Sequence, residues 1–223
     1  MSHDWEAQRL LANISQLVSH IQGHSHLVVD VGCGQGRILR ALAKSNICAV
    51  GIEVNPFLVE VNCADGFNCM TPAQWENSSD VCDVMVMSHV IEHFSPPDLL
   101  PFLEKHLSRL KVDGHLLIAT PLMSDYFYDD FDHVKPYHPT GFLMVFGGTG
   151  AQVQYYARCR LELTDLWFRR SPLRPAFHAG LYLRRPARYF WGLVAALGVI
   201  VFRLSGGMIG QTDGWIGVFR KSG

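Results

Sequence analysis

The 223-residue sequence lacks the patterns that mark secreted, disulfide-rich and repetitive proteins. Its six cysteines are scattered and include no CxxC pair, which favours free thiols in a reducing compartment over a disulfide framework. The first ten residues, MSHDWEAQRL, contain no apolar signal core, and neither an internal repeat nor a low-complexity segment stands out along the chain. We therefore expect a cytoplasmic protein.

Features of disordered proteins are also missing. Charged residues make up 17% of the chain and apolar residues 48%, so the chain can bury a sizeable core. Its length suits one sizeable domain and is too short for two large ones. We therefore expect a single domain over residues 1–223.

The charge is unevenly distributed, although the formal net charge is only −1. Residues 1–150 contain 8 Lys/Arg and 17 Asp/Glu, a balance of −9. Residues 151–223 contain 11 Lys/Arg and 3 Asp/Glu, a balance of +8. This segregation indicates either that the C-terminal third meets an anionic partner or that the two halves face each other within one domain.

Short apolar runs alternate with helical patterns along most of the chain. Strands that are apolar on both faces are typical of a parallel sheet with helices on both sides, so we expect an α/β fold. The expected strands cover residues 26–31, 47–52, 81–87, 115–119, 161–168 and 215–219, with a weaker one at 68–70. The expected helices cover residues 4–22, 35–44 and 98–110, and another lies within 55–80.

The segment VVDVGCGQGR (28–37) places glycines at every second position where a strand turns into a helix. Gly32, Gly34 and Gly36 can adopt positive φ and leave no Cβ in the way of a ligand, which can then lie against the main chain at the helix start. Asp30 lies at the strand end, where its carboxylate can orient the loop or a bound ammonium group. This pattern predicts a cofactor site at the carboxyl end of the sheet.

Glu53 ends the second strand, about 20 residues after the loop, where an acid typically bonds ribose hydroxyls. The loop does not have the GxGxxG spacing of dinucleotide-binding proteins, and Asp30 beside a pyrophosphate would be electrostatically unfavourable. S-adenosylmethionine carries an ammonium, a sulfonium and no phosphate. We therefore favour it over NAD, which makes an NAD-dependent oxidoreductase the weaker reading.

Four segments resemble the class I S-adenosylmethionine-dependent methyltransferases, in particular the group that contains the ubiquinone-pathway O-methyltransferases. They are VVDVGCGQGR (28–37), GIEVN (51–55), DVMVMSHVIEHF (83–94) and LKVDGHLLIATP (110–121). The resemblance covers about residues 26–145. It implies a Rossmann-like, doubly wound sheet of about seven mostly parallel strands, with the last strand antiparallel. Within the single domain we expect an N-terminal helix in 1–24, a cofactor-binding core in 25–150 and a C-terminal part in 151–223 that completes the sheet.

The resemblance also assigns roles to individual positions. The loop with Asp30 and its glycines would hold the methionine part of the cofactor, and Glu53 the ribose, with Val54 against the adenine. Many members have an Asp after the next strand for the adenine amino group, where this chain has NCMTPAQW (68–75) and no acid. The predicted cofactor-binding residues are Asp30, Gly32, Cys33, Gly34, Gly36, Glu53, Val54, Met70, Thr71, Ser88 and His89.

The segment SHVIEHF (88–94) offers two kinds of chemistry. His89, Glu92 and His93 stand at i, i+3 and i+4, a spacing that can bind a divalent metal on one helical face, with His133 or His138 as a fourth ligand. Without a metal, His89, His133 or His138 would act as the general base that takes a proton from the acceptor. Hydrogen-bonded loop histidines without a catalytic role are the alternative. We predict a site without metal and name these three histidines as catalytic candidates.

The C-terminal part contains YFWGLVAALGVIVF (189–202), fourteen residues without a charge, and predicts an apolar helix over 189–204. Fourteen residues are too few to span a bilayer, which needs about 20. Arg184, Arg185 and Arg188 precede this run and Arg203 follows it, which is typical of a helix in the headgroup layer of an anionic membrane. The alternatives are a buried helix, an oligomer interface or a cap over the acceptor pocket. Nucleic-acid binding is not expected, because an apolar run is out of place there.

Together these patterns predict a methyltransferase that uses S-adenosylmethionine to methylate a small, apolar or aromatic acceptor, with oxygen as the favoured target atom. Aromatic and acidic residues crowd the segment after the strand at 115–119 and predict a lid over that acceptor. The alternative is a catalytically silent cofactor-binding or membrane-associated protein that keeps the fold. We expect a cytoplasmic location, with peripheral contact to an anionic membrane through residues 184–203 and a possible oligomer.

Overall fold

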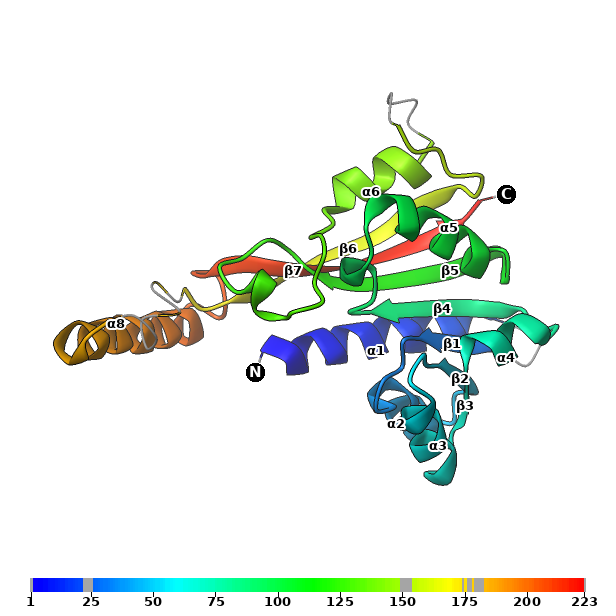
Figure 1. Ribbon diagram of the computed structural model, residues 1–223, viewed down its shortest axis with the longest axis horizontal. Helices are drawn as coiled ribbons and strands as arrows, with labels where there is room; N and C mark the ends of the chain where they lie inside the picture. Colours follow the sequence, from blue (N-terminus) through cyan, green and yellow to red (C-terminus); the bar gives the residue numbers. More distant parts are fainter. Residues whose placement is uncertain are drawn as a thin grey trace.

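A computed structural model describes residues 2–21, 26–148, 154–173, 175, 178 and 183–222. Seven strands form one sheet in the order β3-β2-β1-β4-β5-β7-β6 (Figure 1). The first five strands pair in parallel, and β7 pairs antiparallel with both β5 and β6. The strands are β1 (Val28–Val31), β2 (Ala49–Ile52), β3 (Asn68–Met70), β4 (Cys82–Ser88), β5 (Leu110–Pro121), β6 (Leu161–Ser171) and β7 (Gln211–Lys221). The expected fold class is confirmed, including the antiparallel last strand.

Helices cover both faces of the sheet (Figure 1). They are α1 (Ser2–His20), α2 (Arg37–Lys44), α3 (Pro56–Ala64), α4 (Pro72–Asn77), α5 (Pro96–Leu107), α6 (Pro139–Phe146) and α8 (Arg185–Leu204), with short 3-10 turns η1 (Ile91–His93) and η2 (Phe127–Asp129). Helices α1 and α2 pack on one face of the sheet, and α5 and α6 pack on the other.

Successive side chains of each central strand point to opposite faces of the sheet, and this alternation creates the two cores. In β4, Val84 and Val86 face α1 and α2, whereas Met85 and Met87 face α5 and α6, and all four are fully buried. Burial of a single apolar side chain, such as that of Leu103 in α5, stabilises the fold by roughly 1.5–3 kcal/mol of free energy. The sheet centre is therefore rigid and positions the loops that follow its carboxyl ends.

Several element boundaries differ from the sequence-based expectation: β7 was expected over 215–219 and covers Gln211–Lys221, and β6 was expected over 161–168 and covers Leu161–Ser171. The clearest difference concerns α5 and β5. The helix expected over residues 98–110 is α5, which ends at Leu107, and Leu110 is already the first residue of β5. Strand β5 therefore begins well before the expected residue 115, with an irregularity in its pairing to β4 between Leu110 and His115. Asp113 there has a φ of 63°, a left-handed conformation that hides the strand from a simple apolar pattern.

The C-terminal part departs from the compact layers of the rest. Strands β6 and β7 form a long antiparallel ribbon, and α8 projects from its end beyond the body of the molecule (Figure 1). This helix begins at Arg185, four residues before the apolar run that predicted it. Phe202 is its one buried residue. Among the described residues α8 is the helix that is long and apolar enough to cross a membrane by length and composition.

Candidate active site

The glycine loop lies where the strand order reverses. The chain leaves β1 toward β2 on one side and returns to β4 on the other side. In open sheets of this kind the carboxyl ends of the strands at such a reversal form the ligand-binding crevice. Gly32, Gly34 and Gly36 all have φ between 53° and 73°, as their spacing predicts. A Cβ at Gly36 would collide with Asn62, whereas one at Gly34 would meet no atom within 4 Å. The loop therefore packs against α3 at Gly36 and is open at Gly34.

Asp30 is the acid at the end of β1. It is buried, and one carboxylate oxygen has no hydrogen-bond partner among the described residues. Burial raises the pKa of Asp30 to about 7, with Arg37 lowering it and Glu53 raising it further. A buried carboxyl oxygen without a partner is costly, so this position suits a cationic ligand.

Glu53 stabilises the loop from the end of β2. Its two carboxylate oxygens accept hydrogen bonds from the N–H groups of Gly34 and Asn55, both at 2.8 Å. The next residue, Val54, is 80% exposed beside the loop. Each carboxylate oxygen keeps a lone pair for a ligand hydroxyl. Glu53 can therefore hold the loop and a ribose at the same time.

The side chains of the other predicted cofactor-binding residues differ in what they contact. The Cys33 side chain packs against Cys69, with the two sulfurs 3.6 Å apart. Only the main chain of Cys33 is therefore left to contact a ligand. The Thr71 hydroxyl caps α4 in a reciprocal pair with Gln74. The Ser88 hydroxyl is buried without a hydrogen-bond partner among the described residues. The predicted roles of these residues stay predictions.

The loop and its acids fit S-adenosylmethionine. The unpartnered Asp30 oxygen suits the ammonium group, Glu53 suits the ribose, and the open face of Gly34 leaves room for the ligand against the main chain. When bound, S-adenosylmethionine supplies an electrophilic methyl group on a positively charged sulfur.

His89 follows β4 and has a φ of 57°, a strained conformation for a residue other than glycine. Its Nε2 donates to the Glu6 carboxylate at 2.8 Å, and its Nδ1 makes an ion pair with Glu92 at 3.2 Å. Burial lowers the pKa of His89, but Glu6 and Glu92 outweigh this effect and raise it to about 9. The ring is therefore an imidazolium at neutral pH, which disfavours its predicted use as a general base.

A buried network of charges continues from His89 into the C-terminal part. Glu6 also accepts a hydrogen bond from Arg169 of β6, and Arg169 donates to Asp213 of β7 at 2.8 Å. Asp213 accepts from the Tyr126 hydroxyl at 2.7 Å. The three charged side chains of this chain of contacts, Glu6, Arg169 and Asp213, are at most 5% exposed. The network therefore links α1, β6, β7 and the segment after β5 to His89.

The sequence-based reasoning missed Glu6, Arg169 and Asp213. A signal was present, because Glu6 lies one turn before Leu10 on the apolar stripe of α1 and Arg169 stands at a buried position of β6. A charge on an apolar face needs a buried partner. The partners could not be identified from the sequence, since Arg169 and Glu6 are 163 residues apart.

The other two candidate histidines, His133 and His138, lie in the segment after β5. The His133 Nδ1 donates to the Phe127 carbonyl at 2.7 Å, which leaves Nε2 as the basic nitrogen. The His138 Nδ1 instead accepts from the Thr140 N–H and caps α6. The roles of both as bases stay predictions, and the geometry favours His133 over His138.

The side chains whose potential metal-ligating atoms come together are not the three that the sequence spacing grouped. The ligand atoms of Glu92, His93 and His133 lie within 4.8 Å of one another. His89, which the i, i+3, i+4 spacing had grouped with Glu92 and His93, is instead held by Glu6 and Glu92. Because residues 91–93 form a 3-10 turn rather than an α-helix, the expected common face is not formed.

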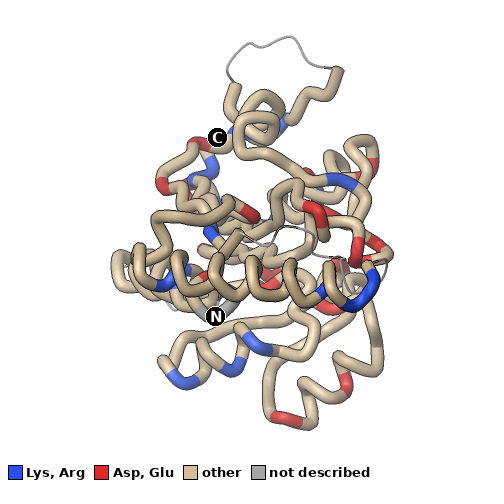
Figure 2. The backbone as a smooth tube through the Cα atoms, turned by 90° about the vertical axis from the view of Figure 1, so that its left-hand side faces the viewer, with Lys and Arg blue, Asp and Glu red and all other residues tan. Residues whose placement is uncertain are grey.

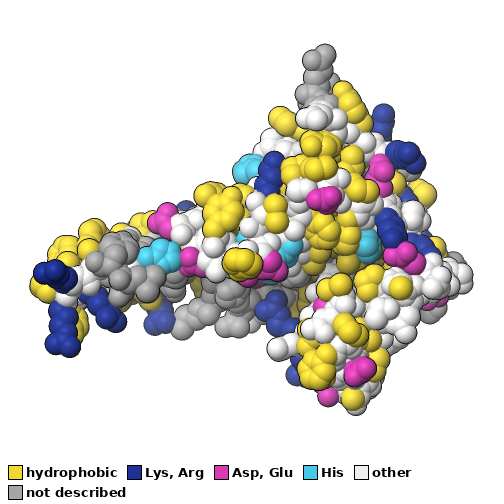
Figure 3. Space-filling view, in the orientation of Figure 1, with side chains coloured by type: hydrophobic (Ala, Val, Ile, Leu, Met, Phe, Trp, Pro, Cys, Tyr) yellow, Lys and Arg dark blue, Asp and Glu magenta, His cyan; other side chains and the backbone are white. Residues whose placement is uncertain are grey.

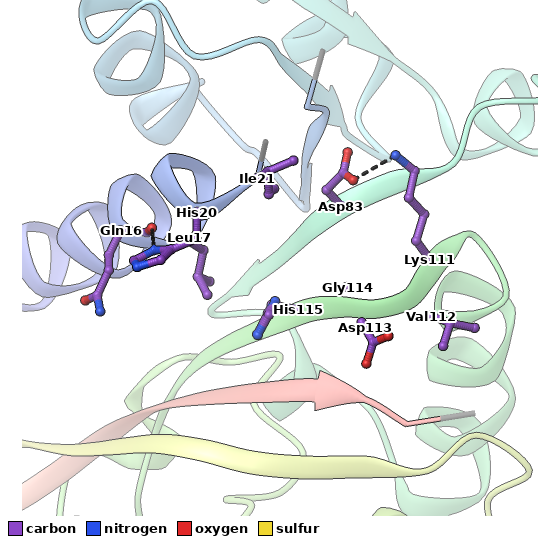
Figure 4. A pocket seen from close by; sticks show the side chains of 10 residues that line it. All are labelled: Gln16, Leu17, His20, Ile21, Asp83, Lys111, Val112, Asp113, Gly114 and His115. Carbon is purple, nitrogen blue, oxygen red and sulfur yellow. Dashed lines mark hydrogen bonds and ion pairs between the residues drawn. The ribbon is translucent and has the colours of Figure 1, made fainter. Parts of the chain in front are cut away.

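A hollow at the opposite end of the strands is separate from this crevice. It has a volume of about 460 Å³, and residues of α1 and the starts of β4 and β5 line it (Figure 4). Its charged pair, Lys111 and Asp83, is already joined at 2.7 Å, and Asp83 also accepts from the Leu27 N–H. These contacts hold strands together and indicate no site.

Comparisons with solved structures show the fold. A SAM dependent methyltransferase from Archaeoglobus fulgidus matches with a TM-score of 0.57 and 18% identity over 96% of this chain and 94% of that one. Magnesium protoporphyrin IX methyltransferase from Synechocystis, solved with bound SAM, matches with a TM-score of 0.58 and 12% identity over 97% and 80% of the two chains. The fold is that of class I S-adenosylmethionine-dependent methyltransferases, as the sequence motifs predicted.

Sequence comparisons give the family. A family model described as a methyltransferase domain matches residues 3–164, and the chain belongs to that family. Two curated relatives are lysine N-methyltransferases that act on a subunit of ATP synthase. The Rattus norvegicus protein is 31% identical over 137 residues (60% of this chain, 58% of the relative), and the Xenopus laevis protein is 31% identical over 110 residues (48% of each). The chain thus spans about half the length of the relatives it matches.

Proposed function

We propose that this chain transfers the methyl group of S-adenosylmethionine to an amine nitrogen, that of a lysine side chain in a protein. The observation that carries this proposal is the segment after β5. Residues 122–138 contain four acids and one lysine, together with several aromatic residues. A negative and aromatic surface favours a cationic acceptor over a neutral one.

Contacts on both sides place this segment beside the crevice. The N–H groups of Val134 and Lys135 donate to the Glu92 carbonyl, just after β4. The Leu122 N–H donates to the Asp213 carbonyl, and Tyr126 bonds the Asp213 carboxylate. The segment therefore covers the carboxyl ends of β4 and β5, where an acceptor has to reach the cofactor.

The chain's own groups have three tasks in this reaction. Asp30, Glu53 and the loop main chain orient the cofactor, and alignment of acceptor and donor supplies most of the acceleration. The acids around the site attract the lysine ammonium. His133, whose Nε2 is the basic nitrogen, is the best-placed of the three candidate histidines to take the proton that the amine must lose before it attacks.

The names of the relatives support a lysine acceptor, since both are lysine N-methyltransferases whose substrate is a protein of the ATP synthase. A second candidate is the small apolar or aromatic acceptor, methylated on oxygen. The observation that favours it is the exposure of Tyr128 and Phe131, which would form an apolar wall. Both acceptors would use the same cofactor crevice.

Product analysis separates the two acceptors. The protein would be incubated with S-adenosylmethionine carrying a labelled methyl group and with a membrane extract, and the labelled products hydrolysed in acid. We expect the label in methylated lysine. Label that extracts into organic solvent as a small ether or ester would support the second candidate and contradict the first. An Asp30→Asn variant is the control, because it should lose transfer to every acceptor.

A further inference from the structure

The outer face of α8 is apolar and exposed. Leu204 is 84% exposed, and the other large apolar side chains of this face are also in solvent: Tyr189, Phe190, Leu193, Leu197, Ile200 and Val201. A helix that faced only water would carry polar residues on this side. On the opposite side the chain comes close to the helix at Gly198, where an added Cβ would lie 2.5 Å from the Leu173 carbonyl oxygen. The outer face therefore needs an apolar environment.

The charges of α8 complement an anionic surface. Arg184, Arg185 and Arg188 stand at its start and Arg203 near its end, and residues 184–204 contain no Asp or Glu. Figure 2 views the molecule from the end that carries α8, and the helix in front has blue positions near its two ends and no red ones. Figure 3 shows the projecting arm covered by hydrophobic and basic side chains. Arginines around an apolar helix favour anionic lipid headgroups.

The sheet pairing decides how such a helix can meet a bilayer. Ser171 at the end of β6 pairs with Gln211 at the start of β7, so both connections to α8 begin at one point. A spanning α8, about 30 Å long, would carry its far end across the membrane. The thirteen residues 172–184 would then have to return through the hydrocarbon. As one helix they would be too short, at about 20 Å, and as an extended chain they would leave N–H and C=O groups unsatisfied.

We propose that α8 lies in the plane of the interface of an anionic membrane, with its outer apolar face in the lipid and its arginines at the headgroups. This docking surface does not depend on which acceptor is methylated. It extends the sequence-based expectation of membrane contact through 184–203 by fixing the mode, since β6 and β7 can stay paired only if α8 does not span.

The docked helix would bring the catalytic crevice to the membrane. Phe202 of α8 stacks on Trp5 of α1 with ring centroids 6.1 Å apart, and Trp5 precedes Glu6 of the buried network. Arg169 and Asp213 lie two residues from the paired ends of β6 and β7. In Figure 1, α8 extends from the edge to which the carboxyl ends of β4 and β5 point. An acceptor at the lipid surface would thus meet the site directly.

Vesicle sedimentation without cofactor or acceptor tests the proposal. We expect the protein to pellet at low salt with vesicles of phosphatidylcholine and phosphatidylserine, and more weakly with phosphatidylcholine alone. The variant Leu193→Glu/Leu197→Glu should lower the affinity by about a hundredfold, because it removes two apolar side chains from the lipid. The matched control Val81→Glu/Val112→Glu adds the same charges at exposed positions away from the arm and should bind normally.

Three outcomes would overturn the proposal. The first is protein that stays in the supernatant with anionic vesicles. The second is equal binding by the two double variants. The third is a dimer in sedimentation equilibrium that the Leu193→Glu/Leu197→Glu change dissolves, with no vesicle binding, since the face would then cover a second copy. Washing the pellet with alkaline carbonate tests the orientation, because an in-plane helix is released and a spanning helix is retained.

Discussion

The half of the molecule that holds the cofactor and the part built from β6, α8 and β7 solve different physical problems. The first buries parallel strands on both faces and carries its chemistry on consecutive residues, as in the loop from Asp30 to Gly36. The second pairs two strands as a ribbon and exposes an apolar helix with one buried residue. The charges differ accordingly, with −9 in residues 1–150 and +8 in residues 151–223. One part is built to enclose a small molecule and the other to meet a large surface.

The largest effect is expected from removing the buried ion pairs of Arg169, which join the two parts in addition to the pairing of β5 with β7. Arg169→Met leaves the Asp213 carboxylate buried without its cation and leaves Glu6 with His89 alone, so we expect the free energy of unfolding to fall by about 3–5 kcal/mol. Arg170→Met is the matched control, because Arg170 is exposed, and it should change stability by less than about 0.5 kcal/mol. Urea unfolding measures both. Equal midpoints would mean that the network does not hold the parts together.

Two glycines of the loop separate stability from cofactor binding. Gly36→Ala combines a positive φ with a collision at buried Asn62, and we expect a loss of about 2–4 kcal/mol in stability. Gly34→Ala meets open space and should cost only about 1 kcal/mol. It should nevertheless weaken S-adenosylmethionine binding at least about tenfold, since the added Cβ points into the crevice. Calorimetric titration beside thermal unfolding would detect the difference, and unchanged affinity in Gly34→Ala would place the cofactor elsewhere.

The ion pairs of His89 make stability depend on pH. Its folded pKa of about 9 lies above the ordinary value of 6.5, so the stabilisation is complete below about pH 6.5 and is lost as the pH rises through about 9. We expect a loss of roughly 1–3 kcal/mol over this interval, allowing for solvent screening at a side chain that is 31% exposed. Thermal unfolding of His89→Gln should be flatter over the same range. Parallel curves for the two proteins would contradict the pairing.

Asp30 links proton release to cofactor binding. Burial keeps the pKa of Asp30 at about 7 in the free protein, so at pH 6 the carboxyl group is mostly protonated. A bound ammonium favours the carboxylate, so binding at pH 6 should release up to about one proton, and affinity should rise from pH 5 to 7. Titrations in two buffers with different ionisation enthalpies measure this release. Asp30→Asn should show none, and a wild type without release would separate Asp30 from the ammonium.

The smallest change in stability is expected from substitutions on the exposed apolar face of α8. Leu193→Glu/Leu197→Glu on the exposed face of α8 should change the free energy of unfolding in solution by less than about 0.5 kcal/mol. Leu103→Ala in the buried face of α5 should lower it by about 2–5 kcal/mol. Denaturant unfolding of the two variants compares an exposed and a buried leucine directly. A large loss in the α8 variant would mean that its outer face is packed in solution.

The same division explains what the sequence could predict. The strands, the glycine loop and the positions of Asp30 and Glu53 follow from local patterns, because neighbouring residues decide turns and burial. The predicted start of β5 was wrong, because Asp113 adopts a left-handed conformation that breaks the alternation.

Contacts between distant residues were beyond the sequence. The spacing of His89, Glu92 and His93 suggested a common helical face, but the chain forms a 3-10 turn there and His133 joins Glu92 and His93 instead. Arg169 finds Glu6 only because β6 lies beside α1 in the folded chain. A single sequence gives the types of these residues, and only the fold gives their partners.

Because Ser171 pairs with Gln211, both connections to α8 leave the sheet at the same point. The stretch between these two residues hangs from a closed ribbon end, and among its described residues Phe202 stacks on Trp5 and His178 forms an ion pair with Asp129. A cassette attached in this way can be exchanged as a unit without shifting the register of β6 and β7. Its composition is then free to follow the surroundings in which the protein works, while the enclosed half keeps the same chemistry.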